Sequence, residues 1–396
     1  MTALLSLDEA QARVLAAAAA LPAETVPLAA AAGRITAEEV RAAVDLPPFA
    51  SSAMDGFAVR SADLPGTLAV VEDVAAGSPA GRPLRTGEAM AISTGGVVPD
   101  GADAVVPIEH VVRTANSVDI GEPAPPGAHI RPRAGDTEAG KPVVGAGVLL
   151  GPTQLGAIAA AGVPRVVCTR RPRVAVLATG SELVAPGQPL APGQVYEANA
   201  LMLAIAFERA GADVERLPAV ADDEDAHRAA IARGLEADVL VTSGGVSVGP
   251  HDLVRSIEAE LGVEELFWRI AVKPGKPVSF GVRGSTLVFG LPGNPVSSLV
   301  GCELLVKPAL RALQGLADPL PAYESGRLAA PLRRNAARDE LVRARARPDG
   351  DGVVLEPLSG QESHMIVHAA AANALVHVER GDGELAAGDS ARFLRI

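Results

Sequence analysis

Three apolar stretches, each running into a loop of small residues, dominate the hydrophobic pattern of the chain. They are RVAVLATGSEL at 173–183, ADVLVTSGGVSVGPHD at 237–252 and STLVFGLPGNPVSS at 285–298. Each begins with a short run rich in β-branched residues, continues into a glycine-containing loop and is followed by a helical pattern. This pattern is typical of βαβ units with buried parallel strands.

The loops that follow these strands are the first candidates for a binding site. In a parallel sheet, the carboxyl ends of the strands meet at one edge, and ligands bind in the crevice there. We therefore expect three segments to converge: Thr179-Gly180-Ser181-Glu182, Ser243-Gly244-Gly245 and Gly290-Leu291-Pro292-Gly293-Asn294-Pro295.

The rest of the chain alternates between helical and strand patterns. Residues 6–21 predict a helix that begins with a capping box of Ser6 and Glu9. Further helices are predicted around 36–44, over 152–163 and over 199–210. Short apolar runs broken by Gly and Pro indicate a small β-rich domain at 61–128, and period-two alternation beyond Pro319 indicates an all-β domain. In that domain, Arg343, Arg345 and Arg347 are expected on one strand face.

The charged residues near the predicted loops allow a structural and a functional interpretation. The acidic run from Asp222 to Asp225 and the later Asp252 both stand at helix starts, where they can stabilise the helix dipole or take part in chemistry. Lys273 and Lys276 flank Pro274-Gly275 on a restricted loop, which favours the binding of an anion over a solvated surface pair.

Composition and charge argue against several classes of protein. A formal charge of −12 argues against a dedicated nucleic-acid binder, because phosphate neutralisation needs a surface rich in Lys and Arg. The two cysteines, Cys168 and Cys302, are far apart and predict neither a disulfide scaffold nor a zinc site. No signal peptide and no membrane span are indicated, which favours a cytoplasmic protein.

The candidate chemistry concerns phosphate or another oxyanion. The chain has no Walker A motif and no G-x-G-x-x-G fingerprint after a strand. The predicted crevice instead combines glycine-rich backbone, two lysines and the carboxylates Glu182, Asp222 and Asp252. Backbone N–H groups and lysines bind oxyanions, and carboxylates beside phosphates usually hold Mg²⁺.

Seven motifs, in order, carry a resemblance to a known family. They are PPFASSAMDGFAVR, AISTGGVVPDGADAVV, IRPRAGD, VAVLATGSELVAPG, TSGGVSVGPHD, VKPGKP and GLPGNPVSS. Together they resemble the molybdopterin molybdenumtransferase family, to which the catalytic domain of gephyrin belongs. The resemblance covers essentially the whole chain.

The resemblance implies a multidomain α/β plus β fold and a homodimer. A discontinuous small α/β N-terminal domain would comprise residues 1–44 and 129–167, with a β-rich insertion domain at 45–128. A three-layer βαβ domain with a parallel sheet, which would bind molybdopterin, would span 168–317. A small β-barrel would follow at 318–396.

The resemblance also implies an activity. The family inserts molybdenum from molybdate into adenylylated molybdopterin, releases AMP and water and uses Mg²⁺. This is the last step of molybdenum cofactor synthesis, so the adenylyltransferase of the same pathway is an expected partner. The active site would lie between the βαβ domain of one subunit and the early domains of the other.

Residue roles follow position by position from the matching motifs. The catalytic residues implied are Asp55, Asp136, Glu182, Asp252, Lys273 and Lys276, with Glu182, Asp222 and Asp252 as metal ligands. The substrate-binding residues expected are Thr94, Arg131, Thr179, Gly180, Ser243, Gly244, Gly245, Ser247, Pro292, Gly293, Asn294, Arg343 and Ser363. Arg343, Ser363 and Ser247 would contact molybdate.

The chain departs from the family pattern at a few positions. Ser181 stands where the family usually has Asp, Phe57 stands where it has Tyr, and Pro250-His251 alters the motif after the Gly-Gly loop. Two alternatives therefore stay open. One is a pterin-binding or scaffolding paralogue without turnover, and the other is a nucleotide pyrophosphate hydrolase.

Overall fold

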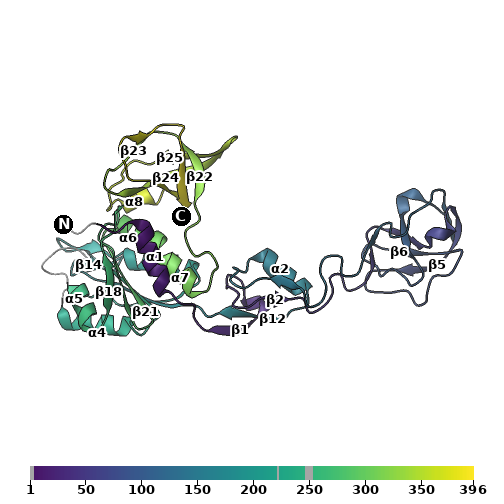
Figure 1. Ribbon diagram of the computed structural model, residues 1–396, viewed down its shortest axis with the longest axis horizontal. Helices are drawn as coiled ribbons and strands as arrows, with labels where there is room; N and C mark the ends of the chain where they lie inside the picture. The colour runs from purple at the N-terminus through teal and green to yellow at the C-terminus, as the bar shows by residue number, and fades with distance from the viewer. Residues whose placement is uncertain (1–3, 221–222, 246–252) are drawn as a thin grey trace. The chain divides into compact units, whose positions relative to one another are not determined.

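The computed structural model describes residues 4–220, 223–245 and 253–396, which fall into two compact units (Figure 1). The first unit combines Met1–Glu24, Gly33–Ala37 and Cys168–Ile396. The second unit combines Thr25–Ala32 and Glu38–Val167. Each unit is therefore assembled from stretches that are separate in the sequence.

The first unit contains a six-stranded sheet with the order β16-β13-β17-β21-β20-β18. The strands from β16 to β21 run parallel, whereas β20 and β18 are antiparallel and complete one edge. The parallel strands confirm the prediction that the apolar stretches form βαβ units. The strands are β13 (Arg173–Ala178), β16 (Asp213–Arg216), β17 (Val239–Ser243), β18 (Glu264–Trp268), β20 (Ser279–Arg283) and β21 (Thr286–Leu291).

Helices cover both faces of this sheet, as the alternation of side chains along β13 shows. Val174 and Val176 join a core that includes residues of α1, α3, α6 and α7, while Ala175 and Leu177 join a core with α4 and α5. Because successive strand residues point to opposite faces, both faces of a buried strand must be apolar. The helices are α1 (Leu7–Ala17), α3 (Asn199–Arg209), α4 (Glu224–Gly234), α5 (Leu253–Glu260), α6 (Pro295–Gly301) and α7 (Lys307–Leu313).

The C-terminal part of the first unit is a closed barrel. Its strands follow the order β24-β25-β22-β28-β26, and β26 pairs back onto β24. Closure leaves no free sheet edge. The short strand β19 (Val272–Lys273) also pairs with β24 and links the barrel to the βαβ domain. The barrel elements are β22 (Glu324–Leu328), β24 (Asp339–Asp349), β25 (Gly352–Pro357), α8 (Ile366–Ala369), β26 (Ala374–Val378) and β28 (Ser390–Arg395).

The second unit is built on a six-stranded sheet with the order β7-β4-β6-β5-β9-β8. Phe57 of β4 is 1% exposed and packs in its core. The sheet strands are β4 (Gly56–Val59), β5 (Gly66–Val74), β6 (Glu88–Ile92), β7 (Ala104–Pro107), β8 (Val112–Arg113) and β9 (Ser117–Ile120). Shorter elements in this unit are β2 (Val40–Arg41), β3 (Ser51–Ser52), β10 (Ile130–Arg131), β11 (Pro142–Val144) and α2 (Pro152–Ala160). In the parts of the chain that are described, no helix is long and apolar enough to cross a membrane.

Most of the local predictions hold, but the helix predicted around 36–44 is absent, and the short helix α8 lies within the domain predicted as all-β. The Ser6–Glu9 capping box is present at the start of α1, as predicted. The helix predicted around 36–44 is wrong, because Val40 and Arg41 instead form β2, which pairs with β11. Backbone pairing with a segment about a hundred residues away outweighs a helix propensity worth only tenths of a kcal/mol per residue.

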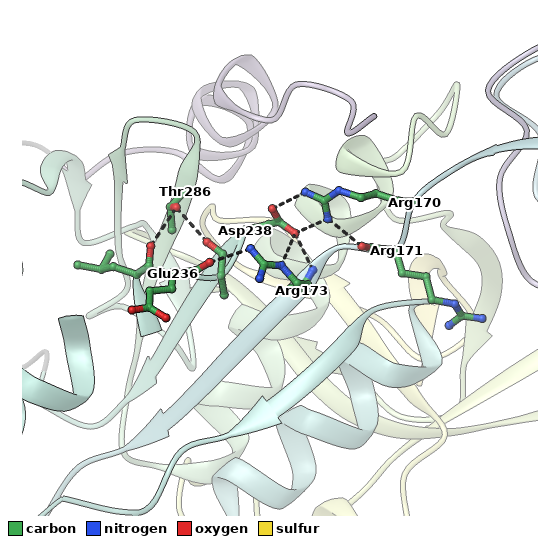
Figure 2. A network of polar contacts seen from close by, with 8 residues as sticks. Arg170, Arg171, Arg173, Glu236, Asp238 and Thr286 are labelled. Carbon is green, nitrogen blue, oxygen red and sulfur yellow. Dashed lines mark hydrogen bonds and ion pairs between the residues drawn. The ribbon is translucent and has the colours of Figure 1, made fainter. Parts of the chain in front are cut away.

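A polar network lies at the amino ends of the strands (Figure 2). The three predicted loops follow the carboxyl ends of the same strands. Arg170 makes two hydrogen bonds of 2.7 Å to the carboxylate of Asp238, which also accepts the backbone N–H of Arg173 at 2.8 Å. Arg173 donates to the carbonyl of Glu236, and Thr286 donates to the carbonyl of Ala237. These bonds join the starts of β13, β17 and β21.

Candidate functional site

A cavity of about 770 Å³ lies at the carboxyl ends of β13, β17 and β21. All three predicted loops line it, through Thr179, Gly180 and Glu182, through Ser243, Gly244 and Gly245, and through Pro292, Gly293, Asn294 and Pro295. The convergence predicted from the hydrophobic pattern is therefore confirmed. The cavity is large enough for a ligand of drug size or somewhat larger.

Glycine is required in the loop after β17. Gly244 and Gly245 have φ values of 101° and 64°, a region that L side chains rarely adopt. A Cβ on Gly244 would also lie 2.6 Å from the carbonyl oxygen of Thr179. The backbone of this loop therefore packs directly against the loop after β13. The Thr179 hydroxyl is buried there without a hydrogen-bond partner among the described residues.

Asn199 is a cavity residue that sequence reasoning missed. It stands at the start of α3, and its amide nitrogen donates to Ser243 Oγ at 2.9 Å and to the Gly293 carbonyl at 2.7 Å. One side chain thereby connects the second and third loops. An Asn at the first position of an apolar helix was the only sequence signal available, and it is the signal of an ordinary cap.

The barrel supplies another part of the cavity wall. Asn294 donates to Ser363 Oγ at 2.8 Å, and the backbone N–H of Val296 donates to the Ser363 carbonyl at 3.0 Å. His364 and Ile366, which follow Ser363, line the cavity. Ser363 therefore lies beside the third loop, although it is 68 residues or more from it in sequence.

Arg343 lies behind this wall and does not line the cavity. The residue is 1% exposed, and its guanidinium donates to the carbonyls of Gly360 and Glu362. Burial lowers the pKa of Arg343, partly offset by the nearby Glu362 carboxylate. Arg345 and Arg347, on the same strand, are exposed. The shared strand face is as predicted, but only Arg343 is covered, by the segment that leads to Ser363.

The loop that carries the two lysines comes close to the cavity, but neither lysine lines it. Pro277, which directly follows Lys276, lines the cavity, and the Lys276 carbonyl accepts the N–H of Ile270 at 3.0 Å. Lys273 lies on β19, where its ammonium forms an ion pair of 2.9 Å with Glu340 of the barrel. The loop thus stands where the βαβ domain meets the barrel.

Carboxylates reach the cavity from two positions in the described residues. Glu182 and Glu197 both line it, and Glu197 also accepts the N–H of Ala200 at 2.7 Å. No group of three or more metal-ligating His, Cys, Asp or Glu side chains occurs within the described ranges. Asp222, Asp252 and Ser247 lie outside the described residues, as does the Pro250-His251 departure.

Contacts within the second unit hold each of its predicted residues. Asp55 accepts the backbone N–H of Thr94 at 2.7 Å, and Arg131 pairs with Ser51 across β10 and β3. The backbone N–H of Asp136 donates to the Leu46 carbonyl at 2.9 Å. The Asp-Gly pair at Asp55 is therefore part of a structured loop with Thr94, which goes beyond a simple turn.

Three family models match successive parts of the chain. The description "MoeA N-terminal region (domain I and II)" fits residues 5–162, "Probable molybdopterin binding domain" fits 175–312, and "MoeA C-terminal region (domain IV)" fits 325–396. The cavity loops belong to the second of these regions, and Ser363 belongs to the third.

Whole-length relatives agree with these matches. The chain is 38% identical over 379 residues to molybdopterin molybdenumtransferase 2 of Mycobacterium tuberculosis, covering 92% of this chain and 93% of the relative. It is 34% identical to the molybdopterin molybdenumtransferase of Haemophilus influenzae, covering 98% of this chain and 97% of the relative. The solved structure of the molybdopterin biosynthesis MoeA protein from Pyrococcus horikoshii superposes with a TM-score of 0.81, at 33% identity and 99% coverage of both chains. The chain belongs to the molybdopterin molybdenumtransferase family.

Proposed function

We propose that this protein inserts molybdenum from molybdate into adenylylated molybdopterin, giving the molybdenum cofactor, AMP and water. The observation that carries the proposal is the cavity at the carboxyl ends of β13, β17 and β21, which all three predicted loops line. Its dimensions suit a pterin nucleotide better than a small metabolite. Family membership supplies the reaction class.

The residues present suit a phosphate-bearing substrate. Glycine-rich loops let backbone N–H groups approach phosphate oxygens closely, and the Lys276 loop adds positive charge beside them. Ser243, Asn294 and Ser363 offer hydroxyl and amide groups for a tetrahedral oxyanion such as molybdate. Arg343 supports this role by holding the segment before Ser363 through carbonyl bonds.

A divalent cation fits this donor set, since Mg²⁺ takes oxygen ligands and prefers carboxylates. We assign Glu182, Asp222 and Asp252 to hold it, where it would neutralise charge on the pyrophosphate. Glu182 lines the cavity. Asp55 and Asp136, which belong to the second unit, are proposed as further catalytic acids, and Lys273 and Lys276 would balance the charge of the leaving AMP.

We further propose that the protein works as a homodimer in the cytoplasm and receives its substrate from the pathway's adenylyltransferase. Two apolar side chains one helical turn apart on α3, Leu201 and Ile205, are 45% and 42% exposed. Such a pair suits a protein interface. The proposed domain limits are 1–44 with 129–167, then 45–128, 168–317 and 318–396, and the family matches at 175–312 and 325–396 fall within the last two. Light scattering on a Leu201→Glu, Ile205→Glu variant tests the dimer, and an unchanged mass would count against this interface.

The activity test combines purified protein, adenylylated molybdopterin, Mg²⁺ and molybdate. We expect AMP release that depends on molybdate and falls at least 100-fold in Lys276→Ala, because a charge near the leaving group contributes several kcal/mol. Lys307→Ala is the matched control, since Lys307 begins α7, pairs with Glu303 and does not line the cavity. Binding without AMP release would indicate a scaffolding paralogue. AMP release that ignores molybdate would indicate a pyrophosphate hydrolase, and an active Lys276→Ala would remove the lysine from the mechanism.

A further inference from the structure

A buried histidine in the cavity has no role in the scheme above. His227 is the fourth residue of α4, is 2% exposed and lines the same cavity as Thr179, Glu182 and Gly245. No motif in the sequence marks it, since it sits in an ordinary helical stretch after an acidic run. A polar ring in such a buried place is costly unless its nitrogens are satisfied.

The hydrogen bonds of the ring determine its tautomer. His227 Nδ1 lies 2.8 Å from the carbonyl oxygen of Asp223, the residue that caps α4. A carbonyl only accepts hydrogen bonds, so Nδ1 carries the proton. In the neutral ring, Nε2 is then an acceptor. No described residue donates to Nε2, and the His227 side chain lines the cavity.

The cavity around His227 suits a flat, partly apolar ring. Leu253 and Val254, at the start of α5, line the wall together with His227, and Leu183 and Ile366 add apolar surface elsewhere. The faces of a planar heterocycle can pack against apolar walls. A single acceptor in the wall can then accept a hydrogen bond from an N–H group on the edge of the heterocycle. A deprotonated phosphate oxygen does not fit beside the neutral ring, because it also accepts and cannot donate.

We propose that His227 is a recognition residue. Its Nε2 accepts a hydrogen bond from the exocyclic amino group of a fused nitrogen heterocycle bound in this cavity. The inference deepens the proposed function, on which it rests, because both halves of adenylylated molybdopterin carry such a group. The adenine and the pterin are the two sources of this chemistry.

Two substitutions separate acceptor loss from general damage. His227→Gln can place a carbonyl oxygen near the position of Nε2 and so keeps an acceptor. His227→Asn keeps a short polar group near Nδ1 but removes the acceptor. His377→Asn is the control, because it makes the same change at a buried histidine of the barrel, outside the cavity. Circular dichroism first establishes that each variant folds.

Calorimetric titration then uses two probe pairs. The first is AMP against purine riboside 5′-monophosphate, which lacks the amino group, and the second is 6-hydroxymethylpterin against its analogue without the 2-amino group. We expect His227→Asn to lose roughly tenfold in affinity for AMP or for the pterin, since an unsatisfied buried donor costs about 1.4 kcal/mol. The affinity for the matching analogue should change less than twofold. His227→Gln should recover most of the loss, and His377→Asn should bind like wild type.

Several results would overturn the assignment. They are equal losses for a probe and its analogue, no loss for either probe, or no binding of either probe to the wild-type protein. A loss confined to AMP identifies adenine as the ring that His227 reads, and a loss confined to the pterin identifies the pterin. These titrations do not depend on turnover. An enzyme that releases no AMP but still shows the selective loss would refute the proposed function while keeping this site.

Discussion

Replacement of Asp238 by Asn should destabilise the first unit by about 2 kcal/mol. The Asp238 side chain is 14% exposed and accepts two bonds from Arg170 and one from the Arg173 backbone. Asn keeps one acceptor oxygen but loses the charge and the two-bond geometry. Hydrogen bonds between charged groups contribute about 1.5–3 kcal/mol, and the 32% exposure of Arg170 places the value toward the lower end.

The assay can follow the first unit by itself. The chain has one tryptophan, Trp268, and it lies on β18 of the same sheet as Asp238. Its fluorescence therefore reports the unfolding of this unit. A loss of about 2 kcal/mol should lower the thermal midpoint by about 4–8 °C. Asp213→Asn is the matched control, because Asp213 is an exposed carboxylate on the adjacent strand, in register with Arg173, and should change stability by less than about 0.5 kcal/mol.

The pH dependence gives a second check. Burial raises the pKa of Asp238, but the hydrogen bonds from Arg170 and Arg173 outweigh it, so the pKa lies below its ordinary value. A lowered carboxyl pKa adds stability above the unfolded pKa of about 3.9, and this stability is lost as the pH falls through the native value. The gap between wild type and Asp238→Asn should thus be constant from pH 6 to 8 and narrow below about pH 4. A gap under 0.5 kcal/mol at neutral pH, or one equal to that of Asp213→Asn, would refute the reasoning.

Three further predictions concern the cavity. Asn199→Ala should lower kcat/KM roughly 10- to 100-fold, because two loops lose their shared donor; kinetics that match wild type would show that the loops hold without it. Gly244→Ala should abolish binding of AMP in a calorimetric titration, since its Cβ would clash with the Thr179 carbonyl and its φ is 101°; unchanged binding would disprove a tight loop contact. Arg343→Met should cost about 3 kcal/mol or less in denaturant titration and free the segment before Ser363, which limited proteolysis would detect; a protected segment would contradict the role given to the guanidinium.

Much of this molecule is determined by its sequence. Buried parallel strands need apolar residues on both faces, so runs such as 174–178 and 239–243 can be recognised in any context. The glycines after β17 mark a backbone conformation that other residues rarely adopt. Both signals are local, and together they predicted the convergence of the three loops. The ordered motifs likewise indicated the family before any fold was known.

Only the tertiary structure decided which distant side chains complete the site. From the sequence, Asn199 is interpreted as a helix cap and His227 as an ordinary helical residue. Both line the cavity because α3 and α4 pack beside it. In the sequence, Arg343 is one of three alternating arginines. Only the structure shows that the 358–362 segment covers it. The predicted helix near Val40 gave way to a strand because its partner is β11, far along the chain. Such contacts depend on long-range packing. The local sequence pattern of a segment does not specify which remote segment will pack against it.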